Sequence, residues 1–474
     1  MSTFKLLING RLEDGDAQMD VINPATEEVL AVAPRASKAQ LEKAVAAAKA
    51  AFPGWSATPL AERRKALQAV AQIVQANAHE LARLLTQEQG KPLADATGEA
   101  FGLAAMFHYF SQFDLLIKVI EDDSSRKVEL RRKPLGVVAL IVPWNFPLII
   151  VGSKVPPALL AGNTVVLKPA PTTPLSTLRF AELIKDALPP GVLNVITDAN
   201  DLGGELTKHP DVRKISFTGS SSTGKKVMSS AAETIKRITL ELGGNDAGIV
   251  LDDADPKKAA QGIFQGAFRN SGQVCVAMKR LYVHESIYDR MCDELVSLAN
   301  EAVVGDGLEQ GTQFGPLQNR MQFEKVKTII EDAGKHGRVL TSGTVPEKGF
   351  FIRPTIVRDI ADGTRLVDEE QFGPVLPVIK YSDPEDALAR ANASPYGLGA
   401  SVWSSNPARA QALAERMDAG TVWINKHSEL APNIPFGGAK ESGIGAEMGE
   451  DSINEYTQLQ VINAARGAAK DGRG

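Results

Sequence analysis

Only two of the 474 residues are cysteine, Cys275 and Cys292, and they lie 17 positions apart. A disulfide framework or a cysteine-based zinc ribbon needs paired cysteines, so neither class fits this chain. We therefore expect no metal centre, and any chemistry at a cysteine must use a single thiol.

The chain also lacks an excess of positive charge. Its net charge is -5 at pH 7, and its basic clusters, Arg131–Lys133 and Lys225–Lys226, are short. A nucleic acid partner needs a broad positive field, so we expect none.

The first residues, MSTFKLLINGRLEDGD, carry scattered charges and no apolar core of the kind found in secretory signals. We therefore expect a cytoplasmic protein.

The longest uncharged apolar segment contains residues that break helices. The 20 positions from Pro134 to Ser153 carry no charge and equal the length of a membrane span. Pro143, Asn145 and Pro147 interrupt their centre, where lipid would require an unbroken helix. We expect a buried strand, turn and helix there, and no membrane partner.

What the sequence does contain is an ordinary globular composition, 43% hydrophobic and 23% charged. Its length predicts two or three domains. Strand and helix patterns alternate from Gly136, through GVVALIV, NTVVLKPA, KISFTGS and RITLELGG, and alternate again after Gly244, from AGIVL to GTVWIN. Residues 37–113 have a mainly helical pattern. The sequence thus predicts an α/β fold with parallel sheets covered by helices.

Three residues occupy positions that suit a catalytic role. Cys275 follows a small-residue turn in FRNSGQVC, which suits a nucleophile, although most cysteines are small buried hydrophobes. Glu241 ends an apolar strand before two glycines and could ionise a thiol or a water, or be a solvated loop acid. Asn145 lies between two prolines and could stabilise an oxyanion, or form a plain Asx turn. Cys292 lies on an amphipathic helix, where a core role is expected.

Seven motifs occur in an order and spacing that resemble one family. They are PWNFP, VLKPA, FTGSSSTGK, ELGGN, GQVC, EEQFGPV and PFGGAKESGIG, with 34 positions between Glu241 and Cys275. The chain resembles the NAD(P)-dependent aldehyde dehydrogenase superfamily from Ile22 to Gly445. The resemblance implies two Rossmann-like parallel-sheet domains and a small β-flap that forms oligomers.

The resemblance also implies boundaries for these parts. Residues 1–115 and 136–243 would form the NAD(P)-binding domain, and residues 244–445 the catalytic domain. Residues 116–135 and 446–474 would form the oligomerisation flap with a C-terminal strand and tail. We expect a homodimer or homotetramer.

The resemblance implies catalytic roles for three residues that match the family's motifs. Cys275 would attack the aldehyde carbon, and the Asn145 amide with the Cys275 backbone N–H would hold the oxyanion. Glu241 would activate water to hydrolyse the resulting thioester. The residues expected to contact the cofactor are Trp144, Lys168, Gly219, Ser220, Glu370 and Phe372.

Two departures from common patterns concern the cofactor and the water. Pro171 stands where NAD-preferring relatives often carry a glutamate, so we expect NAD with NADP as the alternative. Gln458 stands where some relatives carry an acid that is thought to relay protons. Gly219–Lys225 imitates a phosphate-binding P-loop, but Lys226 replaces the Ser or Thr that would hold magnesium, so nucleotide hydrolysis is not expected.

The substrate class rests on two positions and a set of apolar residues. Arg269 matches one of two arginines that grip the carboxylate in succinate semialdehyde dehydrogenases, and Ser153 replaces the other. The expected apolar lining is Phe146, Ile149, Ile150, Val274, Leu430 and Phe436. It favours uncharged aliphatic or aromatic aldehydes, with acid-bearing semialdehydes as the alternative.

Three rival functions remain open at this stage. A CoA-acylating relative would lack the base at Glu241. A cysteine hydrolase would need a histidine partner, and His284 is the histidine nearest to Cys275 in sequence. A non-catalytic descendant of the fold would not be expected to keep Asn145, Glu241 and Cys275 together.

Overall fold

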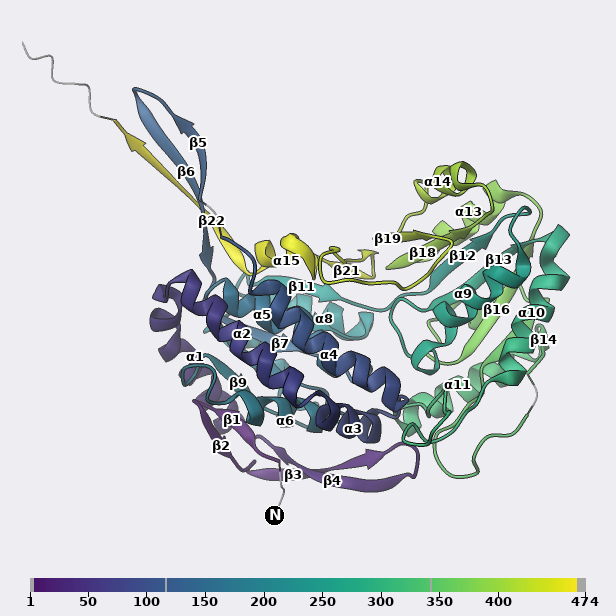
Figure 1. Ribbon diagram of the computed structural model, residues 1–474, viewed down its shortest axis with the longest axis horizontal. Coiled ribbons are helices and arrows are strands. Elements are labelled where there is room, and N and C mark those ends of the chain that lie inside the picture. The colour runs from purple at the N-terminus through teal and green to yellow at the C-terminus, as the bar shows by residue number, and fades with distance from the viewer. Residues whose placement is uncertain (1–3, 116, 342, 467–474) are drawn as a thin grey trace, which may run out of the picture.

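The computed structural model describes residues 4–115, 117–341 and 343–466. Figure 1 shows two sheets with their helices, side by side, and a narrow three-stranded flap that projects from the first. In the described part of the chain, no helix is both long and apolar enough to cross a membrane.

The first sheet has eight strands, and its five central strands are parallel. Their spatial order is β2 (Arg11–Glu13), β1 (Leu6–Ile8), β9 (Leu193–Val195), β8 (Thr164–Lys168), β7 (Val137–Ile141), β10 (Val212–Thr218), β11 (Arg237–Glu241) and β21 (Gly443–Ile444). The edge strand β21 comes from near the C-terminus and pairs antiparallel with β11, at Glu241. A distant segment of the chain therefore closes the sheet beside that carboxylate.

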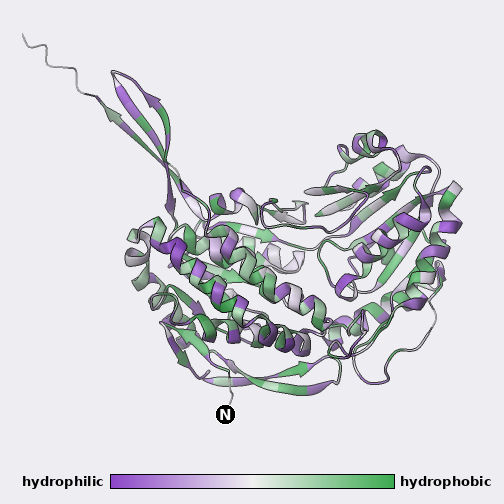
Figure 2. Cartoon of the chain, in the orientation of Figure 1, coloured by the Kyte–Doolittle hydropathy of each residue, from purple (hydrophilic) through white to green (hydrophobic). Residues whose placement is uncertain are grey.

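Helices cover both faces of this sheet because its strands are apolar on both sides. In β7, Val138 and Leu140 pack into one core and Val137, Ala139 and Ile141 into another. The first core is covered by α2 (Leu60–Ala76), α3 (Ala78–Gln89), α4 (Leu93–Phe110), α5 (Pro147–Leu160) and α6 (Leu175–Ile184). The second is covered by α1 (Lys38–Ala57), α7 (Gly203–Lys208) and α8 (Ser221–Ala232). Figure 2 shows hydrophobic and hydrophilic residues alternating along the helices of the first layer.

The second sheet has seven strands, parallel except for the edge strand β14. Their order is β14 (Arg338–Val339), β15 (Thr355–Arg358), β16 (Val375–Tyr381), β13 (Met278–His284), β12 (Asp246–Val250), β18 (Gly399–Trp403) and β19 (Thr421–Ile424). One face is packed by α9 (Pro256–Phe268) and α10 (Tyr288–Glu301), the other by α11 (Arg320–Ala333), α13 (Pro384–Asn392) and α14 (Pro407–Ala414). The predicted α/β class and the two parallel sheets are confirmed.

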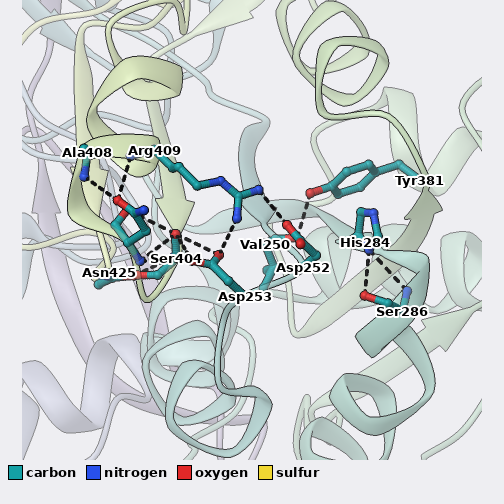
Figure 3. A network of polar contacts seen from close by, with 11 residues as sticks. Val250, Asp252, Asp253, His284, Ser286, Tyr381, Ser404, Ala408, Arg409 and Asn425 are labelled. Atoms are coloured by element: carbon teal, nitrogen blue, oxygen red, sulfur yellow. Dashed lines mark hydrogen bonds and ion pairs between the residues drawn. The ribbon is translucent and has the colours of Figure 1, made fainter.

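The carboxyl ends of the second sheet are closed by polar contacts (Figure 3). Asp253 accepts hydrogen bonds from Ser404 Oγ at 2.8 Å and from the Asn406 N–H at 3.0 Å. Arg409 donates to Asp252 at 2.6 Å. These groups therefore satisfy one another. The catalytic candidates lie at the opposite end of the sheet, before β13.

The flap consists of β5 (Lys118–Asp122), β6 (Arg126–Pro134) and β22 (Thr457–Ala465). β22 pairs antiparallel with β6 from Thr457–Pro134 to Ala465–Arg126. Ile120, Leu459 and Val461 are exposed on it, each by more than half. The predicted C-terminal strand is therefore present, while the end of the tail, 467–474, lies outside the described residues.

Candidate active site

A cavity of about 280 Å³ lies where the two sheets face each other. Its walls come from α4 and α5, the ends of β10 and β11, the segment before β13 and the loop after β19. It brings together Cys275, Glu241 and Asn145. The same cavity is lined by all eight residues expected around the substrate: Phe146, Ile149, Ile150, Ser153, Arg269, Val274, Leu430 and Phe436.

Cys275 lies in a turn between the 3-10 segment Arg269–Gly272 and β13. Asn270, Ser271 and Gly272 before it all have positive φ, of 51°, 53° and 70°. Such backbone is costly for non-glycine residues and is typical of functional turns. Lys279 stabilises the turn by donating to the Gly272 carbonyl oxygen at 2.6 Å.

Burial raises the pKa of the Cys275 thiol, and the nearby carboxylates of Glu241, Asp246 and Glu370 raise it further. These surroundings therefore favour the protonated thiol. Attack on a substrate requires a base or a positive charge close to the sulfur.

Glu241 is the last residue of β11, and neither of its buried carboxyl oxygens has a hydrogen-bond partner among the residues that the structure describes. Burial raises its pKa well above 4.5, and the Glu447 carboxylate raises it further, although Lys154 opposes both. A buried polar group without a partner is unfavourable for stability. Such a group points to a role with substrate or water.

Asn145 comes just before the helix α5. Its side-chain amide donates to the Gln273 carbonyl oxygen at 3.0 Å, two residues before Cys275. An amide nitrogen carries two hydrogens, so one remains available to an oxygen in the cavity. The nucleophile turn and the candidate oxyanion donor are thus fixed to each other.

Four buried residues that sequence reasoning did not single out as a group lie together beside the cavity, and two of them, Ser153 and Glu447, line it. Lys154 forms an ion pair with Glu447 and donates to Ser216 Oγ at 2.7 Å. Ser153 Oγ also donates to Glu447, at 2.7 Å. The Ser153 hydroxyl is therefore already bonded to Glu447, and it does not replace the positive charge of the arginine found in succinate semialdehyde dehydrogenases. A lone lysine within the apolar run of α5 was the one sequence signal for this cluster.

Gln458 does not belong to this cluster. It is exposed on β22, where it pairs in register with Lys133, and it does not line the cavity. Position 458 therefore lies away from the cavity that Cys275 and Glu241 line. An acid that does line this cavity is Glu447.

A second cavity lies at the carboxyl ends of the parallel strands β7, β8 and β10. Ile141, Lys168 and Phe217 line it from those ends, together with Gly203 and Gly204. A Cβ at Gly204 would meet nothing within 4 Å. Dinucleotides bind at this edge of parallel sheets, so the open groove fits such a ligand.

The residues expected to hold the cofactor fall into two groups. Lys168 lines the groove and donates to buried Asp198 at 2.5 Å. Gly219 and Ser220 connect β10 to α8, and Ser220 Oγ accepts the Thr223 N–H at 3.3 Å as the cap of that helix. The N-terminus of a helix favours a phosphate.

The second group lies close to Cys275. Glu370 accepts the Gly244 N–H at 3.0 Å, and a Cβ at Gly244 would lie only 2.5 Å from the Cys275 carbonyl oxygen. The Phe372 ring packs edge-on against Trp144, with centroids 5.4 Å apart. Of these three residues, Glu370 is near enough to Cys275 for its charge to raise the pKa of the thiol.

Neither nearby histidine can serve Cys275 as a base. His284 is at the far end of β13, where it bonds to Ser286 at 2.8 Å (Figure 3). His427 is buried, and its ring nitrogens contact the Val276 carbonyl oxygen and Ser401 Oγ, each at 3.0 Å. Burial lowers the pKa of His427 to about 3. The cysteine hydrolase hypothesis has no support in this geometry.

Comparison with known proteins gives a consistent picture. Residues 12–462 match the aldehyde dehydrogenase family. The phenylacetaldehyde dehydrogenase of Pseudomonas fluorescens and the mitochondrial aldehyde dehydrogenase of Leishmania tarentolae are each 40% identical to the chain, covering 97% of it and 95% of their own lengths. The NAD+ complex of Bacillus cereus aldehyde dehydrogenase superposes with a TM-score of 0.95 at 38% identity, covering 98% of this chain and 96% of that one. The chain belongs to the aldehyde dehydrogenase family, as its motifs predict.

Proposed function

We propose that this protein oxidises uncharged aliphatic or aromatic aldehydes to carboxylic acids, with NAD as cofactor and NADP as the alternative. The observation that carries the proposal is the presence of Cys275, Glu241 and Asn145 in the wall of one largely apolar cavity. A thiol, a carboxyl group without a partner and an available amide N–H are the groups that acyl chemistry at an aldehyde carbon requires.

The first step is attack by sulfur. Glu241 accepts the thiol proton of Cys275, and the thiolate bonds to the aldehyde carbon. The Asn145 amide and the Cys275 backbone N–H donate to the oxygen that becomes negative. A bound nicotinamide ring supplies the acceptor for the hydride of that carbon.

Loss of the hydride leaves a thioester on Cys275. Before hydrolysis, Glu241 gives the proton that it took from the thiol to solvent. It then takes a proton from a water molecule, whose oxygen attacks the thioester carbon. The carbon–sulfur bond breaks, releasing the carboxylic acid and returning the proton to the thiol. The ion pair of Lys154 and Glu447 lies beside Glu241 and adjusts its charge.

The groove and the cluster beside Cys275 suit the two ends of a dinucleotide. Lys168 would bind the adenosine ribose, Gly219 and Ser220 the pyrophosphate, and Glu370 and Phe372 the nicotinamide ribose. The groove also contains exposed Lys208 and Lys226, for which no ion pair is found in the part of the chain that the structure describes. With Pro171 in place of a carboxylate, NADP remains the alternative.

Uncharged substrates suit the cavity because its walls are mostly apolar. Ile149, Ile150 and Phe436 contribute apolar surface, and the Glu447 carboxylate that also lines the cavity is already paired with Lys154. An aromatic aldehyde is consistent with the relative named phenylacetaldehyde dehydrogenase.

One observation favours a second candidate, an acid-bearing semialdehyde of the succinate semialdehyde type. Arg269 is exposed at the cavity and stacks over Phe146 at 5.7 Å. Among residues 4–115, 117–341 and 343–466 it has no ion pair. It could therefore receive a carboxylate.

The experiment that tests both candidates is reduction of NAD or NADP with octanal, benzaldehyde and succinate semialdehyde, with identification of the product. Turnover of the first two with release of free acid supports the proposal. Turnover of succinate semialdehyde alone supports the second candidate. Product formation that requires coenzyme A would favour an acylating enzyme instead.

The proposal extends to assembly and location. We assign residues 1–115 and 136–243 to cofactor binding, 244–445 to catalysis, and 116–135 with 446–474 to a homodimer or homotetramer. The exposed apolar residues Leu459 and Val461 on the flap suit contact with a second copy. Both cysteines are free, which suits the reducing cytoplasm. Light scattering and cell fractionation test these points.

A further inference from the structure

A buried lysine contacts the residue proposed to hold the oxyanion. Lys91, which is 1% exposed and follows α3, donates to the backbone carbonyl oxygen of Asn145 at 2.8 Å. It also forms an ion pair with Glu99, and its ammonium lies 3.7 Å from the centre of the Phe146 ring. All three directions of the ammonium are thus used by partners.

The partner of this lysine fixes the other end of the same segment. Glu99 on α4 accepts the N–H groups of Leu148 at 2.9 Å and Ile149 at 3.2 Å. These are among the first N–H groups of α5, which have no partner within the helix. One ion pair therefore holds both ends of residues 145–149.

This segment carries the Asn145 amide and part of the cavity wall. The Asn145 carbonyl oxygen also accepts from Asn270 Nδ2 at 3.2 Å, in the turn before Cys275. With its backbone held by Lys91 and Asn270, the Asn145 side chain reaches the Gln273 carbonyl oxygen at 3.0 Å. The backbone that carries the amide is thus held by Lys91, which follows α3, and through Glu99 by α4.

We propose that Lys91 and Glu99 are positioning residues that hold the Asn145 amide in the geometry needed to stabilise the oxyanion. This inference rests on the proposed function of Asn145. A buried ion pair is weak evidence for stability, because apolar residues of similar size often serve as well. The Lys91–Glu99 pair contacts both ends of residues 145–149, which points to a role in orienting this segment. A displacement of about 1 Å at a catalytic group can slow a reaction roughly a hundredfold.

The decisive test is a double-mutant cycle of Lys91→Met and Asn145→Ala, measured as kcat/KM for benzaldehyde. Asn145→Ala is expected to lower kcat/KM about a hundredfold or more, as loss of an oxyanion donor does. Lys91→Met alone is expected to lower it at least about tenfold. Added to Asn145→Ala, it should change kcat/KM by no more than about twofold, since it acts through that amide.

A second readout separates positioning from general damage to the site. Alkylation of Cys275 by iodoacetamide needs the thiolate but no oxyanion donor, so Lys91→Met should leave its rate within about twofold of the wild type. Lys214→Met is the matched control, because Lys214 is also fully buried and donates to Thr239 Oγ1 at 2.6 Å. It should lower the melting temperature and leave kcat/KM within about twofold.

Loss of Lys91 could unfold the protein by leaving Glu99 unpaired. The variant Lys91→Met with Glu99→Leu removes both charges, so it should fold and show the same loss of kcat/KM as Lys91→Met. If the losses of kcat/KM in Lys91→Met and Asn145→Ala multiply in the double variant, or if Lys91→Met slows alkylation of Cys275, the inference is overturned. The proposed function of Asn145 is unaffected by either result. An active Asn145→Ala variant would overturn both.

Discussion

Glu241 and Cys275 line one cavity, and the Glu241 carboxylate is among the causes of the raised pKa of the Cys275 thiol. Each of these two acids thus opposes ionisation of the other. When ionisation of one group opposes ionisation of the other, the Cys275 thiol and the Glu241 carboxyl group favour a single negative charge between them. This suits a catalytic cycle in which the charge lies first on the Glu241 carboxylate and then on the Cys275 sulfur.

Replacement of Cys275 by alanine should lower aldehyde oxidation by at least about a thousandfold, because the nucleophile is lost. Formation of reduced cofactor measures it. Cys292→Ala is the control, since Cys292 is fully buried on α10 among apolar residues. It should cost about 1 kcal/mol of stability and leave turnover unchanged. Equal activity of wild type and Cys275→Ala would exclude the thiol mechanism.

Glu241→Gln should stabilise the folded protein at alkaline pH. The folded state raises the pKa of Glu241 above 4.5 and so binds its proton more tightly than the unfolded chain. Its contribution to stability is therefore present below about pH 4.5 and is lost as the pH rises towards the folded pKa. Glutamine cannot ionise, so the variant should be more stable by roughly 1–3 kcal/mol at pH 8 and similar at pH 4.5. Denaturant unfolding at both pH values measures this, and a less stable variant at pH 8 would disagree.

Arg269→Leu should distinguish the two substrate classes. If uncharged aldehydes are the substrates, kcat/KM for benzaldehyde should stay within about threefold of the wild type, because the guanidinium makes no ion pair with them. For succinate semialdehyde, kcat/KM should fall about tenfold or more through loss of a charged hydrogen bond. A large loss with benzaldehyde would mean that the arginine supports the cavity itself.

Lys168→Met should weaken cofactor binding about tenfold, with little change in KM for the aldehyde, because the lysine lines the groove and not the substrate cavity. The binding of reduced cofactor is measured by fluorescence titration. Loss of the lysine leaves the buried Asp198 unpaired, so the double variant with Asp198→Asn serves as the control for folding. Unchanged affinity in both variants would place the cofactor elsewhere.

The sequence was sufficient to predict the architecture and the neighbours of Cys275. Strand and helix patterns are local, and the family's motifs identify the residues that meet at the cavity. Glu241 and Asn145 were proposed from their positions at a strand end and in a proline turn, and both line the cavity.

The partners of those residues were not predicted, because their contacts join distant parts of the chain. Lys154 and Glu447 are 293 positions apart, and Lys91 and Asn145 are 54 positions apart. No local pattern signals such a pair. Glu447 was not singled out for the same reason, since distance along the chain does not reveal which acid returns to the first sheet.

The most direct test of the central claim is rapid mixing of Glu241→Gln with benzaldehyde and NAD, followed by mass spectrometry of the Cys275 peptide. If Glu241 both accepts the thiol proton and helps water to hydrolyse the thioester, the variant should form reduced cofactor more slowly than the wild type. It should then stop after up to one turnover per site, with the acyl group on Cys275. Continued turnover at the wild-type rate, without acyl group on Cys275, would contradict the account.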